Sequence, residues 1–421
     1  MGNAAELRAE HILFAITVIL AVGSVLGFVA QRLRVPDIVL FLIAGIVLGP
    51  EVAGVLNIPA TSELSWIIII FTASYILFDG GAELELEILG KVWISLVIIV
   101  TFGVLITAFV TGFAAHWIVG IPVTVGLLLG AAMAATDPAT LVPVFRQVRV
   151  RPKVAQFVVS ESGFNDPTGA IITLVFLALV TGGAGVGQHI AVGPAVLNLV
   201  EQAGIGIGVG LVLGYVGSFI VAHERYGFLS DYVKLVTLIA VIGGYLGAVG
   251  WHASGFMAAF VAGLVMGNMH YFGLKMPRDV RPRFEGFVGT TSLISRMFIF
   301  ILLGSQVKLG LIVQYWWEGL AVVAVFMFVA RPLTVFLSTA PDRRARWKWR
   351  ELVFMSWVRE TGVIPGALAS ILIASGAPDA NVLAAIIFMG ILITIILQAT
   401  TAKWLAGRLG LLIPDQPPQG G

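Results

Sequence analysis

The sequence lacks cysteine, the residue that crosslinks small secreted domains, and has few of the charged residues that cover the surface of soluble domains. Its 421 residues include no cysteine, which excludes disulfide bonds, iron–sulfur clusters and thiolate metal sites. Charged residues make up only 11% of the chain, whereas a soluble domain has about 25%. The first apolar run, residues 12–30, lacks the basic segment and cleavage site of a signal peptide, so we expect it to be retained. These absences argue against an ordinary soluble fold.

Apolar residues and glycine are abundant instead. Hydrophobic residues reach 58% and the mean hydropathy is +1.00, values typical of a polytopic membrane protein. Glycine, with 49 residues, lets helix backbones approach closely where no water-driven hydrophobic effect draws them together. We therefore predict an all-α polytopic membrane protein that forms one membrane unit with short loops and a short cytoplasmic tail at residues 407–421.

The apolar runs predict thirteen transmembrane helices. A span needs about 20 residues to cross the hydrocarbon layer, so we expect the short second run to be broken or tilted. Lysine and arginine set the orientation, because they concentrate in cytoplasmic loops. With the N-terminus outside and the C-terminus inside, 20 basic residues lie in cytoplasmic segments and only Arg8 and Lys308 lie outside. The predicted spans are 12–30, 36–50, 64–80, 92–117, 122–145, 154–180, 195–222, 232–250, 255–271, 286–304, 311–337, 350–374 and 381–406.

A polar face interrupts the sixth predicted span. Glu161, Ser162, Asn165 and Asp166 share an arc of about 140° at 100° per residue, so one side of the helix carries all four. An ionised carboxylate at the bilayer centre costs roughly 3 kcal/mol, which makes such residues candidates for function. This face must look into the bundle or a cavity. A purely structural hydrogen-bonded network is the alternative.

Two predicted spans contain helix-breaking residues. In the fifth, Pro138 follows Thr136 and Asp137, and proline lacks an N–H group and clashes with the preceding turn. In the twelfth, Gly362, Pro365 and Gly366 weaken the helix. Paired broken helices in the two halves of a transporter point to its binding site. Because spans five and twelve are seven apart, their repeat units would run in opposite orientations, as inverted repeats.

Spans five and six together supply oxygen ligands. A hard cation binds carboxylate, hydroxyl, amide and backbone carbonyl oxygens together with water. Asp166, Ser162, Asn165 and Thr136 provide that set, and Asp137 can compensate the positive end of a half-helix. The sequence therefore predicts a charged, water-accessible site for a cation and a proton.

The other charged residues in or near spans are given supporting or surface roles. Arg331 needs an acidic partner, for which Glu161 is the candidate, and Arg359 is expected to support the broken helix through backbone carbonyls or Glu360. Arg296 is interpreted as an interface residue whose long side chain reaches the headgroups. Four acids at the end of span 64–80 are interpreted as cytoplasmic surface that attracts cations: Asp79, Glu83, Glu85 and Glu87.

Four motifs in these segments, and two weaker ones, resemble a known family. The sequence is similar to the cation/proton antiporter superfamily, specifically its sodium/proton exchanger branch, over essentially the whole chain. The pair formed by TDP and ESxxND is the most specific part of the resemblance. The motifs are ATDPAT at 135–140, SESGFND at 160–166, ARPL at 330–333 and RETG at 359–362, with VPDIVLFLIAGIVLGP at 35–50 and FIFILLG at 298–304 as the weaker ones.

The resemblance implies a fold of inverted repeats in which two broken helices cross, working as an elevator-type homodimer in the cell membrane. Residues 1–90 and 195–304 would form mainly the dimerisation scaffold, and 91–180 and 311–406 mainly the moving core. Asp166 would bind Na⁺ or a proton alternately. Thr136, Asp137 and Ser162 would complete the site, and Glu161 would pair with Arg331.

The resemblance also bears on charge and on selectivity. Electrogenic relatives carry Asp-Asp where this chain has Asn165-Asp166, which suggests electroneutral 1:1 exchange. Many relatives have Arg-Gly where Glu360 follows Arg359, so the role of this pair stays open. We expect no cofactor and no nucleic-acid partner, only monovalent cations, protons, lipid and a second copy of the chain.

Three alternatives remain. The nearest is a K⁺/H⁺ antiporter on the same fold, because cavity size decides between Na⁺, Li⁺ and K⁺. An intramembrane aspartyl protease using Asp137 and Asp166 is remote, since the sequence lacks the Gly-x-Gly-Asp signature. A passive channel is also disfavoured, because the sequence contains no filter-type segment.

Overall fold

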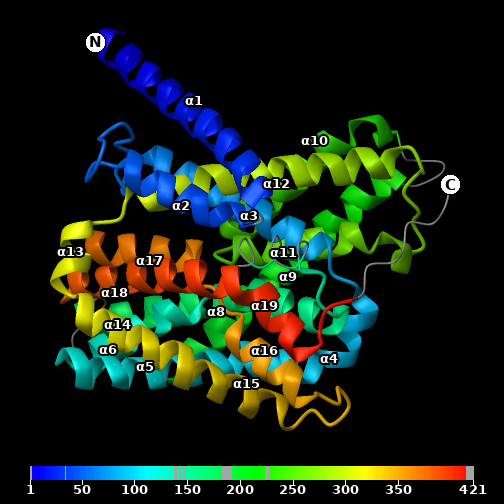
Figure 1. Cartoon of the computed structure of the whole chain (residues 1–421). Helices are drawn as coiled ribbons and strands as arrows, with labels where there is room; N and C mark the ends of the chain where they lie inside the picture. The colour runs from blue at the N-terminus through cyan, green and yellow to red at the C-terminus, as the bar shows by residue number, and fades with distance from the viewer. Residues whose placement is uncertain are drawn as a thin grey trace.

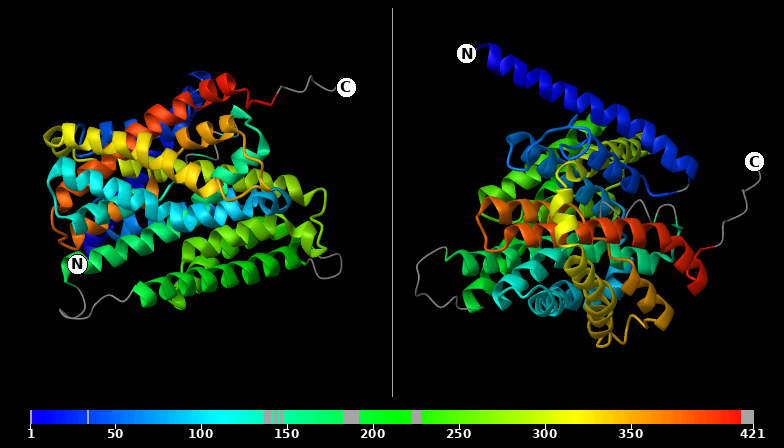
Figure 2. Two further views of the ribbon diagram at one scale, coloured as in Figure 1. Left: turned by 90° about the horizontal axis from the view of Figure 1, so that it is seen from below. Right: turned by 60° about the vertical axis from the view of Figure 1, so that its left-hand side comes forward.

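The computed structural model describes residues 2–33, 35–136, 141, 145, 148–182, 192–222 and 228–413. Regular structure in these residues is helical apart from one isolated bridge between Val150 and Leu412. Most helices lie roughly along one direction, and α1 runs obliquely away from the rest (Figure 1, Figure 2). An all-α fold, as predicted, is confirmed.

Nine helical stretches of the described residues are long and apolar enough to cross a membrane, and four shorter apolar helices accompany them. This confirms a polytopic membrane protein, whereas the count of thirteen spans and their orientation stay predictions. The long stretches are α1 (Gly2–Leu33), α3 (Glu63–Ala82), α4 (Leu86–Ile98) with α5 (Val104–Val119), α8 (Pro152–Thr181), α9 (Val192–Ala222), α10 (Val233–Gly250), α12 (Val280–Ser305), α14 (Trp316–Val325) with α15 (Arg331–Thr339), and α18 (Ala380–Ile393) with α19 (Thr400–Leu409). The shorter helices are α2 (Asp37–Leu48), α6 (Val123–Ala134), α11 (Gly255–Gly267) and α17 (Val363–Ala374), and α13 (Leu309–Gln314) and α16 (Trp349–Trp357) complete the fold.

Three of the long stretches contain a π-helical turn. These turns are η1 (Ile99–Gly103), η4 (Phe326–Ala330) and η5 (Thr394–Ala399). A π turn inserts one extra residue into a helix and occurs often at functional sites. Thr394 lies in η5, Arg331 directly follows η4, and the Thr107 hydroxyl donates to the carbonyl oxygen of Gly103 in η1.

The helix in the twelfth predicted span is interrupted. α16 ends at Trp357, residues 358–362 are not helical, and α17 starts at Val363. The interruption predicted around Gly362 and Pro365 is present: Gly362 directly precedes α17, and Pro365 lies in the first turn, where a proline loses no helical hydrogen bond. In the fifth span α6 stops at Ala134 and Ala135 is extended, with ψ of 140°. Pro138 lies outside the described residues.

Glycine brings some helices into direct backbone contact. On α2, a Cβ atom at Gly45 would meet the carbonyl oxygen of Ile301, and on α12 a Cβ at Gly304 would meet the carbonyl oxygen of Leu42. The two helices therefore touch along a surface that only glycine permits, as expected for membrane helices packed by shape. α2 is a single uninterrupted short helix.

This close packing explains why the interpretation of Arg296 as an interface residue is wrong. Its side chain is buried between α12 and the start of α2. Nη2 lies 3.2 Å from Asp37 Oδ2, and Nη1 donates to Ser292 Oγ at 3.1 Å. Because an acid of α2 is within reach, the guanidinium is neutralised inside the protein instead of reaching the headgroups.

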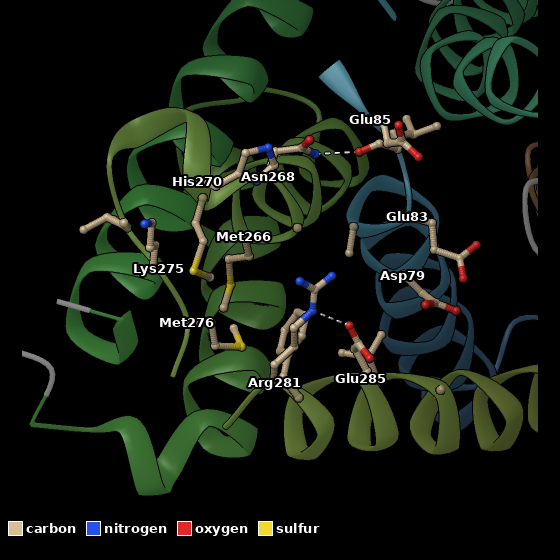
Figure 3. A pocket seen from close by; sticks show the side chains of 18 of the residues that line it. Asp79, Glu83, Glu85, Met266, Asn268, His270, Lys275, Met276, Arg281 and Glu285 are labelled. Carbon is tan, nitrogen blue, oxygen red and sulfur yellow. Dashed lines mark hydrogen bonds and ion pairs between the residues drawn. The ribbon is translucent and has the colours of Figure 1, made fainter. Parts of the chain in front are cut away.

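Asp79 also differs from its prediction as a surface residue. α3 continues to Ala82, and Asp79 is only 2% exposed, whereas Glu83, Glu85 and Glu87 are exposed as expected. Asp79 contributes to the wall of a cavity of about 1130 Å³ between the ends of α3 and α11 and the start of α12 (Figure 3). There Asn268 donates to Leu84 O at 2.6 Å and its Oδ1 accepts from Leu86 N, so it ties α11 to the connection between α3 and α4.

The glycine contact can be tested by adding one methyl group. We expect Gly304→Ala to destabilise the protein by about 1–3 kcal/mol, because overpacking forces the two backbones apart. Gly286→Ala is the control on the same helix, since nothing lies within 4 Å of a Cβ atom there. Thermal unfolding in detergent should show a lower Tm for the first variant alone. Equal Tm values would refute the contact.

Candidate functional site

Three of the predicted site residues meet where α6 ends. Thr136 Oγ1 lies 2.6 Å from Ser162 Oγ and donates to Asn165 Oδ1 at 3.0 Å, and the backbone N–H of Thr136 donates to the same Oδ1 at 3.2 Å. All three residues are at most 2% exposed. Because the chain turns extended at Ala135, the Thr136 N–H loses its helical acceptor, and the Asn165 amide replaces it.

The two acids of the predicted site are described less fully. Asp137 lies outside the described residues. Asp166 belongs to α8 and directly follows Asn165. Their roles as cation and proton ligands stay predictions.

A buried ion pair involves Glu161, which directly precedes Ser162 in α8. Glu161 and Arg331 pair through both carboxylate oxygens, with Arg331 Nη2 at 2.9 Å from Oε2 and Nη1 bonded to Oε1. Arg331 Nε also donates to the carbonyl oxygen of Met355 at 3.0 Å. The pair expected from sequence is thus present, and it ties α8 to α15 and α16. This bidentate salt bridge satisfies N–H donors of the planar guanidinium, and its hydrogen bonds offset part of the free-energy cost of burying two charges.

Arg359 connects the two interruptions. It lies in the non-helical segment before α17, and its Nη2 donates to the carbonyl oxygen of Ala134, the last residue of α6. Nη1 donates to Thr107 Oγ1 at 3.1 Å, and the guanidinium lies 5.0 Å from the Phe326 ring centre. The last carbonyls of a helix lack partners and carry partial negative charge, so an arginine is a suitable cap.

Arg359 was expected to support its broken helix through backbone carbonyls or through Glu360. The structure shows a bond to a backbone carbonyl, and this carbonyl belongs to α6, in the other interrupted span. Glu360, the next residue, is fully buried in the same segment.

Three buried threonines were missed by the sequence analysis. Thr394, in η5, accepts a hydrogen bond from the backbone N–H of Thr361 at 3.1 Å. It thus provides a partner for a backbone group of the second interruption, as Asn165 does for the Thr136 N–H in the first. Thr107 and Thr334 lie 3.0 Å apart through their hydroxyls, next to Arg359 and Arg331. Threonine in an apolar helix is a weak signal, because it can bond to its own preceding turn, as Thr394 also does with Gly390 O at 2.7 Å.

Known proteins share this arrangement of helices. Residues 16–408 match the family described as sodium/hydrogen exchanger, transmembrane. The chain belongs to this sodium/hydrogen exchanger family. The resemblance seen in the TDP and ESxxND motifs is thereby confirmed.

Three comparisons within the family are informative. The chain is 32% identical to Na(+)/H(+) antiporter 1 of Methanocaldococcus jannaschii, over 93% of this chain and 94% of that protein. It is 27% identical to K(+)/H(+) antiporter NhaP of Alkalimonas amylolytica, over 96% of this chain and 68% of that protein. The solved structure of the sodium proton antiporter MjNhaP1 at pH 8 superposes with a TM-score of 0.77 at 30% identity, covering 95% of this chain and 99% of that one. These relatives are named as transporters, not as enzymes.

The buried ion pair leads to a stability prediction. Glu161→Ala should lower stability by about 3–5 kcal/mol, because it leaves Arg331 buried without its carboxylate. The double variant Glu161→Leu/Arg331→Met should recover most of that loss, since no uncompensated charge remains. Thermal unfolding of the two variants and of wild-type protein decides this. A Glu161→Ala variant as stable as wild type yet inactive would instead place Glu161 in the ion site.

The second interruption leads to a further prediction. Thr394→Val leaves the Thr361 N–H without its acceptor and should cost about 1–3 kcal/mol, the penalty for an unsatisfied buried group. Thr400→Val is the control, because the Thr400 hydroxyl is exposed and bonds only to its own helix. Hydrogen exchange at residues 358–362 should rise in the first variant alone. Unchanged exchange there would rule out support by Thr394.

Proposed function

We propose that the protein exchanges Na⁺ for H⁺ across the cell membrane as a secondary active antiporter. The observation that carries this proposal is the cluster of Thr136, Ser162 and Asn165 oxygens, buried at the end of α6 and adjoining Asp166 in the chain. Membership of the sodium/hydrogen exchanger family and 32% identity to a protein named Na(+)/H(+) antiporter 1 support it.

The proposed mechanism is competition for one carboxylate. A bound Na⁺ requires ionised Asp166 and takes further oxygens from Ser162, Thr136 and the unwound backbone. A bound proton neutralises the same carboxylate, so the two ions exclude each other. Asp137 compensates the half-helix end beside the site. Transport of either loaded form then couples the two fluxes without a separate device.

Asn165 supports a stoichiometry of 1:1. Its amide oxygen already accepts two hydrogen bonds from Thr136, and an amide carries no charge that a proton or cation could exchange. Asp166 is then the single exchanging carboxylate of the Asn-Asp pair. One positive charge moves in each direction, so transport is electroneutral.

We propose the finer architecture on the same basis. Thirteen spans with the N-terminus outside and the C-terminus inside agree with nine long and four short apolar helices among the described residues. The contact from Arg359 to Ala134 supports two interrupted helices that cross in inverted repeats. The scaffold comprises mainly residues 1–90 and 195–304 and the elevator core mainly 91–180 and 311–406, in a homodimer.

A K⁺/H⁺ antiporter is the second candidate. It is favoured by the similarity to proteins named K(+)/H(+) antiporter, at 26–27% identity. Na⁺ and K⁺ differ in size and not in charge, so the same oxygens can serve either ion. Proton flux measured against Na⁺, Li⁺ and K⁺ gradients separates the two candidates.

The central prediction concerns Asp166→Asn. In proteoliposomes this variant should lose cation-dependent proton movement entirely, because the amide can hold neither the proton nor a charge for Na⁺. Its thermal stability should stay near that of wild type. Asp231→Asn is the control, since the Asp231 side chain is 81% exposed and pairs only with Arg283 among the described residues. Exchange that persists in Asp166→Asn would overturn the assignment.

The same liposomes test the stoichiometry. Wild-type exchange should not change when a membrane potential of either sign is imposed with valinomycin and K⁺. A rate that depends on the sign of the potential would contradict 1:1 exchange, while leaving the role of Asp166 intact.

A further inference from the structure

The connection between α15 and α16, together with the first turn of α16, carries an exposed basic surface. We call it the basic platform, and it consists of the exposed side chains of Arg343, Arg344, Arg346, Lys348 and Arg350. In Figure 1 the connection lies beside the ends of α19 and α4. Arg350 approaches Gly410 at the end of α19, and Arg151 donates to the Gly410 carbonyl oxygen at 3.4 Å.

Residues next to these basic side chains in the sequence anchor the platform. Asp342 is 4% exposed and accepts from the backbone N–H and the hydroxyl of Ser95, at 3.1 and 2.7 Å, and from Ala345 N at 3.1 Å. Trp347 donates from Nε1 to Ser95 Oγ at 2.8 Å and packs edge-on against Phe157, with ring centres 4.9 Å apart. Residues 342, 345 and 347 thus point inward, which fixes a geometry in which the basic side chains project outward.

The acids of this region are already engaged. Glu351 accepts from Lys153 Nζ and from Lys348 N, at 3.1 and 3.0 Å. Burial by itself would raise the pKa of Asp342, but the hydrogen bonds from Ser95 and Ala345 outweigh it and hold that pKa below the ordinary value. Asp342 therefore stays ionised at neutral pH, and its charge is directed inward.

The platform itself has no acidic partner in the described part of the chain. The ion pairs there include none of its five side chains. Five positive charges on an anchored loop repel one another, so this arrangement favours a ligand that carries negative charge.

Exposed tryptophans and leucine place the platform at the membrane surface. Trp349 is 64% exposed beside Arg350, with 5.7 Å from the guanidinium to the ring centre, and Trp404 is 62% exposed beside Arg408. Tryptophan is enriched at headgroup level in membrane proteins. Leu337, 51% exposed on α15, comes six residues before Arg343, so the apolar surface ends just before the platform begins.

We propose that the basic platform binds the phosphate groups of anionic lipids in the cytoplasmic leaflet. Clusters of four to eight basic residues just cytoplasmic of a transmembrane helix are typical of such sites. Orienting the chain in the membrane requires only that positive charge be present in the loop. It does not require the buried Asp342 and Trp347 contacts that hold these side chains in one place.

The experiment compares lipids that differ only in headgroup charge. Purified protein in neutral detergent is titrated with phosphatidylglycerol or with phosphatidylcholine of the same chains, and the rise in Tm gives the apparent affinity. We expect stabilisation by phosphatidylglycerol alone. Arg343→Gln/Arg344→Gln should weaken its apparent affinity on the order of 30-fold, from the attraction of each basic residue to an anionic surface.

Two controls make the outcome decisive. Arg281→Gln/Arg283→Gln removes the same charge from another exposed segment, where both arginines already have acidic partners. The proposal is overturned if Arg281→Gln/Arg283→Gln weakens phosphatidylglycerol binding as much as Arg343→Gln/Arg344→Gln does. It is also overturned if phosphatidylglycerol does not raise the Tm of the wild-type protein. Equal stabilisation by glycerol 3-phosphate at the same concentration would show that the platform binds a soluble phosphate and would also overturn the lipid proposal. Lys348→Gln/Arg350→Gln provides a second variant should the first fold poorly.

Discussion

Two helices end inside the bundle, and every backbone group that they leave without a helical partner must find one within the protein. In a bilayer no water is available to replace such a partner, and an unsatisfied group costs several kcal/mol. Asn165 accepts the Thr136 N–H, Arg359 caps the Ala134 carbonyl, and Thr394 accepts the Thr361 N–H. The partners come from α8, from the segment before α17 and from η5, so satisfying the two interruptions also holds these parts of the chain together with the end of α6.

The buried charges follow the same requirement. Glu161 and Arg331 neutralise each other in a two-pronged contact, and the remaining Nε of Arg331 bonds to Met355 O. Arg359 meets the neutral oxygens of Ala134 and Thr107 and the face of Phe326. One arginine therefore has a dedicated carboxylate, while the other places positive charge at the end of α6, next to the Thr136–Ser162–Asn165 cluster. A positive charge at this place favours the ionised form of a neighbouring carboxylate.

A buried contact could be predicted from the sequence only where a residue had few possible partners. Arg331 and Glu161 were paired correctly because a deeply buried arginine requires an acid, and few acids lie in apolar spans. Arg296 was misjudged because its partner Asp37 lies 259 positions away, at the start of a helix whose close approach depends on glycine. The interruption before α17 was predicted correctly from Gly362, Pro365 and Gly366, because glycine and proline weaken a helix locally and need no distant partner to do so. Thr107, Thr334 and Thr394 were missed because threonine is common in apolar helices.

The sequence by itself determined the class of protein, the apolar helices, the basic asymmetry of the loops and the polar face of α8. These depend on composition and on the spacing of neighbouring residues along one helix. Only the tertiary structure decided which hydroxyls meet at the end of α6, which carbonyl Arg359 caps and which acids are buried. Those outcomes depend on contacts between helices far apart in the chain, where a shift of a few ångströms makes or breaks a hydrogen bond.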